Sequence, residues 1–292
     1  MKLATLRTTG GTVAAVAVEG GFAPLPAADA GELIAQDGWR DIVAATLAGR
    51  AEGAGPALID EASADYAPVV PHPAKVVCCG LNYADHILEM GRELPAHPTL
   101  FAKFADTLAG AQDRLEVAGS ERVDWEAELA VVVGAELRHA SEEEAARAIA
   151  GYTVANDVSM RDWQHRTLQW FQGKAFDAST PIGPVLVTAD EFGPAPTFRV
   201  RGYVNGRLVQ EGDTATLVFG PARLLAYVSG FTTLRPGDVV LTGTPGGVGA
   251  GMNPPRYLSD GDALATEIDG IGRLVNTVNL NPAPATAAPI HA

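Results

Sequence analysis

The sequence predicts an α+β fold in which strands outnumber helices. Residues 1–20 alternate apolar and polar side chains around Thr9-Gly10-Gly11, a pattern typical of a β-hairpin with a glycine turn. Residues 197–211 predict a second hairpin, because Asn205-Gly206 strongly favours a two-residue turn. Between the hairpins, the apolar and β-branched run DWEAELAVVVG, residues 124–134, indicates a buried strand.

The first half of the chain adds two helices and one strand to this outline. Residues 29–50 carry an apolar stripe of helical period and predict one helix. The run KVVCC, residues 75–79, predicts a buried strand that breaks at Gly80 and leads into a short helix ending near Gly91. The chain contains two cysteines, Cys78 and Cys79, and neighbours in sequence cannot form an ordinary disulfide, so both are expected to be buried strand residues.

The second half continues the mixed pattern. Residues 141–151 (SEEEAARAIAG) predict a helix with a capping box from Ser141 to Glu144 and a stop at Gly151. A further helix is expected at residues 221–230. Three strands are expected after it, at VVLTG and at residues 263–268 and 272–278.

A proline-rich connector divides the chain. Residues 65–75 contain Pro68, Pro71 and Pro73 and are expected to be extended. We therefore predict a small N-terminal α/β module at residues 1–70 and a larger domain at residues 71–281. Residues 282–292, rich in proline and alanine, are expected to form a disordered tail.

Composition excludes some classes of partner. The formal charge of −14 and a pI near 4.8 argue against nucleic acid and against an anionic membrane surface, since both would repel the protein. No segment reaches the apolar length of a transmembrane helix, and the N-terminus lacks the apolar core of a signal peptide. The expected location is the cytoplasm.

The central strand suggests a metal site. Glu126 and Glu128 alternate along it, so both carboxylates project from one face, about 6.5 to 7 Å apart along the chain. That spacing lets both reach one divalent cation, and Asp157, at the end of the run GYTVAND, is the best candidate for a third oxygen ligand. The alternative is an ordinary solvated strand edge.

Other candidate residues flank this strand. His86 and Glu89 are three residues apart on the short helix, so the carboxylate could orient an imidazole that takes a proton from water, or the two could form an exposed pair without function. Lys103 could either cover apolar surface with its stem or direct its ammonium at an anionic ligand. Both pairs of alternatives are open at the level of the residues.

Two later segments resemble the walls of a pocket. Residues 157–184 mix charged and aromatic side chains without a regular period, and we expect aromatic residues near Trp163 and Phe171 to influence substrate choice. The glycine-rich loop, residues 242–251 (TGTPGGVGAG), lacks the ending of a phosphate-binding loop. Its amides and the Thr244 hydroxyl could instead approach a small carboxylate.

Taken together, these stretches resemble the fumarylacetoacetate hydrolase family, in particular its acylpyruvase and 2-hydroxyhepta-2,4-diene-1,7-dioate isomerase-like branch. The matching stretches follow the order of the family from residue 75 to residue 278. They are GLNYADHILEMG, DWEAELAVVVG, GYTVANDVSMRDWQ, GKAFDASTPIGP, GDVVLTGTPGGVG and GDALATEIDGIGRLVNTV.

The resemblance implies a mostly β catalytic domain, a barrel-like β-sandwich roll of mixed sheets with few helices, that pairs as a homodimer. It implies Mg²⁺, with Mn²⁺ or Ca²⁺ as possible substitutes, held by Glu126, Glu128 and Asp157. The other positions that match the family's site are the catalytic residues His86, Glu89, Gln164 and Lys174 and the substrate-binding residues Lys103, Arg161 and Thr244.

The expected function is hydrolysis of a C–C bond in a 2,4-diketo acid of the acylpyruvate or fumarylpyruvate type, as in aromatic catabolism. A divalent cation would stabilise the departing pyruvate enolate, and the substrate would be a small anionic 2-oxo acid. The same chemistry would serve oxaloacetate decarboxylation, tautomerisation or isomerisation of 2-hydroxy-diene-dioates. A binding or structural protein that has kept the fold is the alternative of a different class.

Overall fold

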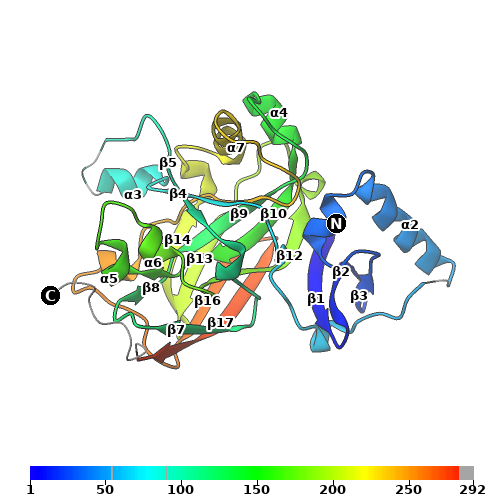
Figure 1. Ribbon diagram of the computed structural model, residues 1–292, viewed down its shortest axis with the longest axis horizontal. Coiled ribbons are helices and arrows are strands. Elements are labelled where there is room, and N and C mark those ends of the chain that lie inside the picture. The colour runs from blue at the N-terminus through cyan, green and yellow to red at the C-terminus, as the bar shows by residue number, and fades with distance from the viewer. Residues whose placement is uncertain (54, 90, 92, 283–292) are drawn as a thin grey trace.

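Three β-sheets form the body of the protein, with short helices around them (Figure 1). The computed structural model describes residues 1–53, 55–89, 91 and 93–282. The expected disordered tail therefore lies outside the described residues, apart from its first residue. Among the described residues no helix combines the length and apolar character needed to cross a membrane.

The largest sheet is mixed and contains the central strand of the sequence analysis. In spatial order it consists of β3 (Gly21–Pro24), β2 (Gly11–Val18), β1 (Lys2–Thr8), β12 (Thr180–Thr188), β10 (Ile149–Asn156), β9 (Ala127–Val133), β15 (Val239–Leu241), β4 (Val76–Gly80) and β5 (Thr99–Lys103), with β6 (Leu108–Ala109) also pairing with β12. The strand predicted at residues 124–134 is confirmed as β9, which begins at Ala127, three residues later than expected. Every residue of β9 is buried, with the odd-numbered residues in one apolar core and Ala130 and Val132 in another.

Two smaller sheets complete the β structure. The five-stranded sheet runs β14 (Arg207–Asp213), β13 (Arg199–Val204), β16 (Ala263–Ile268), β17 (Gly272–Asn281) and β7 (Arg114–Ala118), and the two-stranded sheet pairs β11 (Ser159–Met160) with β8 (Val123–Asp124). The predicted hairpin turn at Asn205-Gly206 joins β13 to β14, and both residues have the positive φ that a type I′ turn requires. The mostly β class with mixed sheets and few helices is confirmed.

Helices are short, and two sequence expectations about them are wrong. The helix expected at residues 29–50 is two helices, because Gly38 takes a left-handed conformation with φ of 70° between them. The helix after Ser141 has its capping box but ends at Arg147, four residues before the expected stop. Gly151 lies instead in β10, where a Cβ would come within 2.2 Å of the Val187 carbonyl oxygen of the neighbouring strand. The helices are α1 (Ala30–Ile34), α2 (Trp39–Ala51), α3 (Ala84–Glu89), α4 (Glu142–Arg147), α5 (Arg161–Gln164), α6 (Phe171–Lys174) and α7 (Pro221–Ser229), with 3₁₀ turns η1 (Glu61–Ser63), η2 (Ala105–Thr107), η3 (Ala189–Glu191), η4 (Thr214–Thr216) and η5 (Gly249–Gly251).

The N-terminal strands extend the largest sheet. β1 pairs antiparallel with β12, and side chains of both strands share one apolar core. Arg7 reinforces this connection, because its guanidinium donates hydrogen bonds to Asp65 and to both carboxylate oxygens of Asp113. In Figure 1 the N-terminal elements lie at one end of the molecule, and α3, α5 and α6 lie toward the other. The predicted boundary at residue 70, between a small N-terminal module and a larger domain, stays a prediction.

Candidate active site

Three carboxylates meet where β9 begins and β10 ends. Glu126 precedes β9, Glu128 lies in it, and Asp157 follows β10, the antiparallel neighbour of β9. The Asp157 amide donates a 2.9 Å hydrogen bond to the Glu126 carbonyl, which fixes these two residues opposite each other. One carboxylate oxygen from each residue lies within 4.8 Å of the other two. The structure thus brings together the residues that the sequence proposed as metal ligands; their role as ligands stays a prediction.

Among the three carboxylates, Glu128 is the one whose negative charge is least compensated by its surroundings. Its side chain is buried, and the hydrogen bond that the described residues give its carboxylate comes from the Gly243 amide at 2.7 Å. Burial raises the pKa of Glu128 well above its ordinary value, and the charges of Asp157 and Glu126 raise it further. A carboxylate in this position favours a proton or a cation beside it.

Two lysine side chains compensate the negative charge of Asp157. The Lys103 Nζ lies 2.5 Å from one Asp157 oxygen, and the Lys174 Nζ lies 2.9 Å from the other and 2.8 Å from Glu126. Burial alone would raise the pKa of Asp157, but the two ammonium groups lower it below the ordinary value. The Lys103 ammonium therefore faces the buried carboxylates and does not rest on apolar surface.

Arg161 and Gln164 enter from α5. The Arg161 Nη1 lies 2.6 Å from a Glu126 oxygen and donates a 2.9 Å hydrogen bond to the Gln164 side-chain carbonyl. Its Nε donates to Asp124 at 2.8 Å. Sequence reasoning missed Asp124, although it precedes Glu126 and Glu128 with the same alternation and that pattern could have identified it.

A cavity of about 620 Å³ opens onto these groups, a size suited to a small ligand. Its polar lining includes Glu126, Arg161, Gln164, Lys174 and Thr244. His165, which directly follows α5, also lines the cavity and received no role from the sequence. The cavity therefore presents both anionic and cationic groups to one small volume.

The opposite wall is aromatic. Trp170 packs edge-on against Phe101 with ring centroids 5.7 Å apart. Gly80 is required beneath the indole, because a Cβ there would lie 2.4 Å from the ring of Trp170. This wall supplies the apolar side of the cavity.

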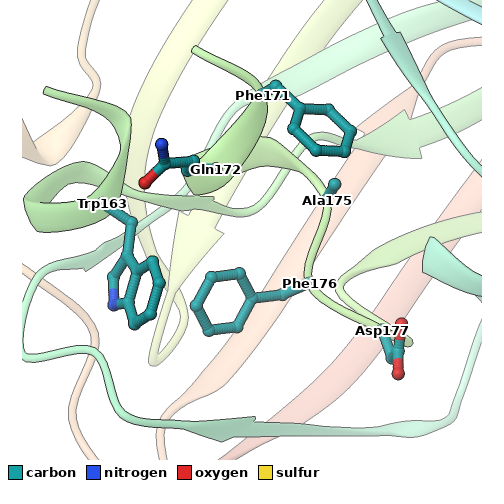
Figure 2. Close-up of a pocket in the computed structure, with 6 residues that line it drawn as sticks. All are labelled: Trp163, Phe171, Gln172, Ala175, Phe176 and Asp177. Atoms are coloured by element: carbon teal, nitrogen blue, oxygen red, sulfur yellow. The ribbon is translucent and has the colours of Figure 1, made fainter. Parts of the chain in front are cut away.

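Trp163 and Phe171 line a different hollow, which Figure 2 shows. That hollow measures about 360 Å³, and Trp163 packs edge-on against Phe176 inside it, while Asp177 lies apart from the rings. Trp163 and Phe171 themselves thus lie outside the cavity beside the carboxylates, whereas Trp170, next to Phe171 in sequence, lines it, so the expectation that aromatic residues near Trp163 and Phe171 influence substrate choice stays a prediction. The short helix α6 separates these side chains, because Lys174 at its end reaches the carboxylates and Phe171 at its start lines the other hollow.

Thr244 lies in the cavity wall with its hydroxyl already engaged. It donates a 2.9 Å hydrogen bond to the Ala127 carbonyl and accepts one from the Gln210 amide at 2.8 Å. The hydroxyl proton is thus directed at backbone, and the hydrogen bonds of Thr244 tie the glycine-rich loop to β9. Its expected contact with a substrate carboxylate stays a prediction.

His86 and Glu89 belong to α3, and the structure describes their backbone. The part of the chain that the structure describes does not include the side chains of these two residues. The roles expected for them as a water-activating pair stay predictions.

The donor set fits a hard divalent cation. Four buried carboxylates, of Asp124, Glu126, Glu128 and Asp157, face three buried basic side chains, of Lys103, Arg161 and Lys174, which leaves one excess negative charge if all are ionised. Carboxylate oxygens are the ligands that Mg²⁺ and Mn²⁺ prefer. The Lys174 ammonium contacts two of the three carboxylates, those of Glu126 and Asp157.

Fold and site together define a mostly β protein in which three converging carboxylates lie beside a cavity of small-molecule size. The model of the fumarylacetoacetate (FAA) hydrolase C-terminal domain matches residues 75–279, more than half of the chain. The chain therefore belongs to the fumarylacetoacetate hydrolase family, and the resemblance stated from the sequence is confirmed.

Individual relatives agree with this assignment. The chain is 46% identical to the mitochondrial oxaloacetate tautomerase fahd2 of Xenopus laevis over 212 residues, which cover 72% of this chain and 66% of that protein. Among solved structures it is similar to fumarylacetoacetate hydrolase from Exiguobacterium antarcticum, with 34% identity, a TM-score of 0.82 and coverage of 96% and 100% of the two chains. It is also similar to maleylpyruvate hydrolase from Sphingobium sp. SYK-6 in complex with manganese(II) and pyruvate, with 27% identity, a TM-score of 0.79 and the same coverage.

Proposed function

We propose that this protein uses a divalent cation to promote enolisation of a small 2-oxo acid, and that oxaloacetate tautomerisation is its first candidate reaction. The observation that carries the proposal is the meeting of Glu126, Glu128 and Asp157 beside a cavity lined by basic and amide donors. The 46% identity to an oxaloacetate tautomerase supports this ranking over the acylpyruvate hydrolysis that the sequence alone favoured.

The carboxylates would hold the cation, with Mg²⁺ as the proposed ion and the manganese of the Sphingobium relative as support for a metal of this type. When bound, such an ion supplies a Lewis acid that stabilises negative charge on substrate oxygens. Arg161 and Gln164, adjacent on α5, are positioned to bind the substrate carboxylate. Lys174 lines the cavity, and its ammonium can donate a hydrogen bond to the oxygen that becomes negative on enolisation, a contact that could contribute about 3 kcal/mol.

Tautomerisation moves one proton from C3 of oxaloacetate to the oxygen on C2 and needs no attacking water. C–C hydrolysis of an acylpyruvate is the second candidate, and it requires a base that deprotonates water. The spacing of His86 and Glu89 on α3 and the similarity to a maleylpyruvate hydrolase favour it.

A small anionic 2-oxo acid is the proposed substrate for both reactions. A homodimer is the proposed assembly, and the cytoplasm is the proposed location.

A substrate panel tests the proposed function. Oxaloacetate tautomerisation and decarboxylation, and cleavage of acylpyruvates and fumarylpyruvate, would be assayed with excess Mg²⁺ and again with EDTA. We expect accelerated oxaloacetate tautomerisation that EDTA abolishes and Mg²⁺ restores. Equal rates with and without EDTA, or no turnover of any panel member, would contradict the proposal.

A further inference from the structure

We propose that Asp124 is a positioning residue that aims Arg161 into the active-site cavity and joins it to the glycine-rich loop, which also lines that cavity. The Asp124 side chain is fully buried and accepts four hydrogen bonds. No role was assigned to it from sequence. The inference rests on the proposed function, in which Arg161 binds the carboxylate of a 2-oxo acid.

The two oxygens of Asp124 divide these contacts. Oδ1 accepts from the amides of Trp125 at 2.8 Å and Gly249 at 2.7 Å. Oδ2 accepts from the Ala250 amide at 2.9 Å and from the Arg161 Nε at 2.8 Å. One oxygen atom therefore links a loop amide directly to the arginine.

The loop is shaped for this contact. A Cβ at Gly249 would lie 2.0 Å from the Arg256 carbonyl oxygen and 2.8 Å from Asp124 Oδ1, so the close approach of the loop depends on glycine. Ala250 and Gly251 in turn line the cavity beside Arg161. Asp124 thus holds two walls of the same cavity at a fixed separation.

The contact also fixes the direction of the guanidinium. Its Nε faces Asp124, and its Nη1 faces Glu126 and the Gln164 carbonyl. Burial alone would lower the pKa of Arg161, but Glu126 and Asp124 raise it above the ordinary value, so the group stays charged in the cavity wall. Because Glu126 is also a candidate metal ligand, Asp124 is the charged partner of Arg161 that lies outside the proposed cation site.

Asp124→Asn tests the assignment with a side chain of the same shape. The asparagine oxygen can serve two of the four donors, but its NH₂ group then faces donors and the negative charge beside Arg161 is lost. We expect the Kd for pyruvate, a non-reacting 2-oxo acid measured calorimetrically at saturating Mg²⁺, to rise about 10- to 100-fold. The Kd for Mg²⁺ alone should change less than about 3-fold.

Asp162→Asn is the matched control. Asp162 neighbours Arg161 on α5, but its carboxylate accepts from the Ser120 hydroxyl and the Glu121 amide. This variant should bind pyruvate like the wild type.

A double-mutant cycle separates positioning from general stabilisation. If Asp124 acts through Arg161, pyruvate binding should be no weaker in Asp124→Asn/Arg161→Gln than in Arg161→Gln alone. Additive losses, or unchanged pyruvate affinity in folded Asp124→Asn, would overturn the proposal. Should Asp124→Asn fail to fold, Asp124→Glu, which keeps the charge and displaces it by one methylene, enters the same cycle. Wild-type protein that binds neither Mg²⁺ nor pyruvate would refute the proposed function itself.

Discussion

Glu126→Ala is expected to abolish Mg²⁺ binding and turnover. The substitution removes one of three carboxylates that converge within 4.8 Å. Loss of an outer hydrogen-bond partner of a metal ligand already costs about 10- to 100-fold in metal affinity, and loss of a direct ligand should cost more. Calorimetric titration of Mg²⁺ and oxaloacetate turnover would measure both effects.

The variant should fold, which makes the result interpretable. Lys174 keeps its contact with Asp157, and Arg161 keeps Asp124, so neither buried cation is left without a partner. Glu267→Ala is the control, because Glu267, on β16, also pairs with arginines but belongs neither to the three converging carboxylates nor to the cavity lining. Retained Mg²⁺-dependent activity in Glu126→Ala would rule out this residue as a ligand.

His86→Ala is expected to separate the two candidate reactions. Removing a general base from a hydrolytic step costs about 100- to 10,000-fold, whereas oxaloacetate tautomerisation requires no activated water. We therefore expect acylpyruvate cleavage to fall by that factor and tautomerisation to persist. Parallel assays of both substrates on one preparation would give the ratio directly.

His97→Ala provides the comparison, because His97 is an exposed histidine whose ring lies near Tyr227. It should change neither reaction. If His86→Ala lowers both reactions equally, His86 serves enolisation and not water activation, and the distinction drawn between the two reactions is wrong.

Much of the fold was readable from sequence where one local signal dominates. Burial on both faces gives β9 an apolar run from Leu129 to Val133, and Asn205-Gly206 determines a hairpin turn almost alone. The stop of α4 was misplaced, because Gly151 serves the packing of β10 against β12 and has no role in the helix. A glycine required by a partner distant in sequence resembles a helix terminator when only its neighbours are considered.

The candidate site also has a part that follows from local sequence and a part that depends on residues distant in sequence. The spacing in the sequence brings Glu126, just before β9, close to Glu128, within β9, and Asp157 joins them through the pairing of β9 with β10. Asp124 continues the same spacing but ends β8, and its role depends on the distant Arg161 and Gly249. Sequence spacing could not show that connection.

Lys174 marks the limit of sequence reasoning most clearly. Its match to the family implied a catalytic role, but only the structure shows that its ammonium lies between Glu126 and Asp157 in the cavity wall. The four-residue helix α6 sets the direction of the Lys174 side chain. The same helix places Phe171 outside the cavity wall that contains Trp170 and Phe101. Side-chain directions on such short elements are set by tertiary packing.

A crystal soaked in Mn²⁺ would show, through the anomalous difference density of the ion, whether Glu126, Glu128 and Asp157 share one cation. We expect one peak per chain, bound by an oxygen of each of these three residues at about 2.0 to 2.3 Å. The absence of a peak among these residues would contradict the proposed cation site.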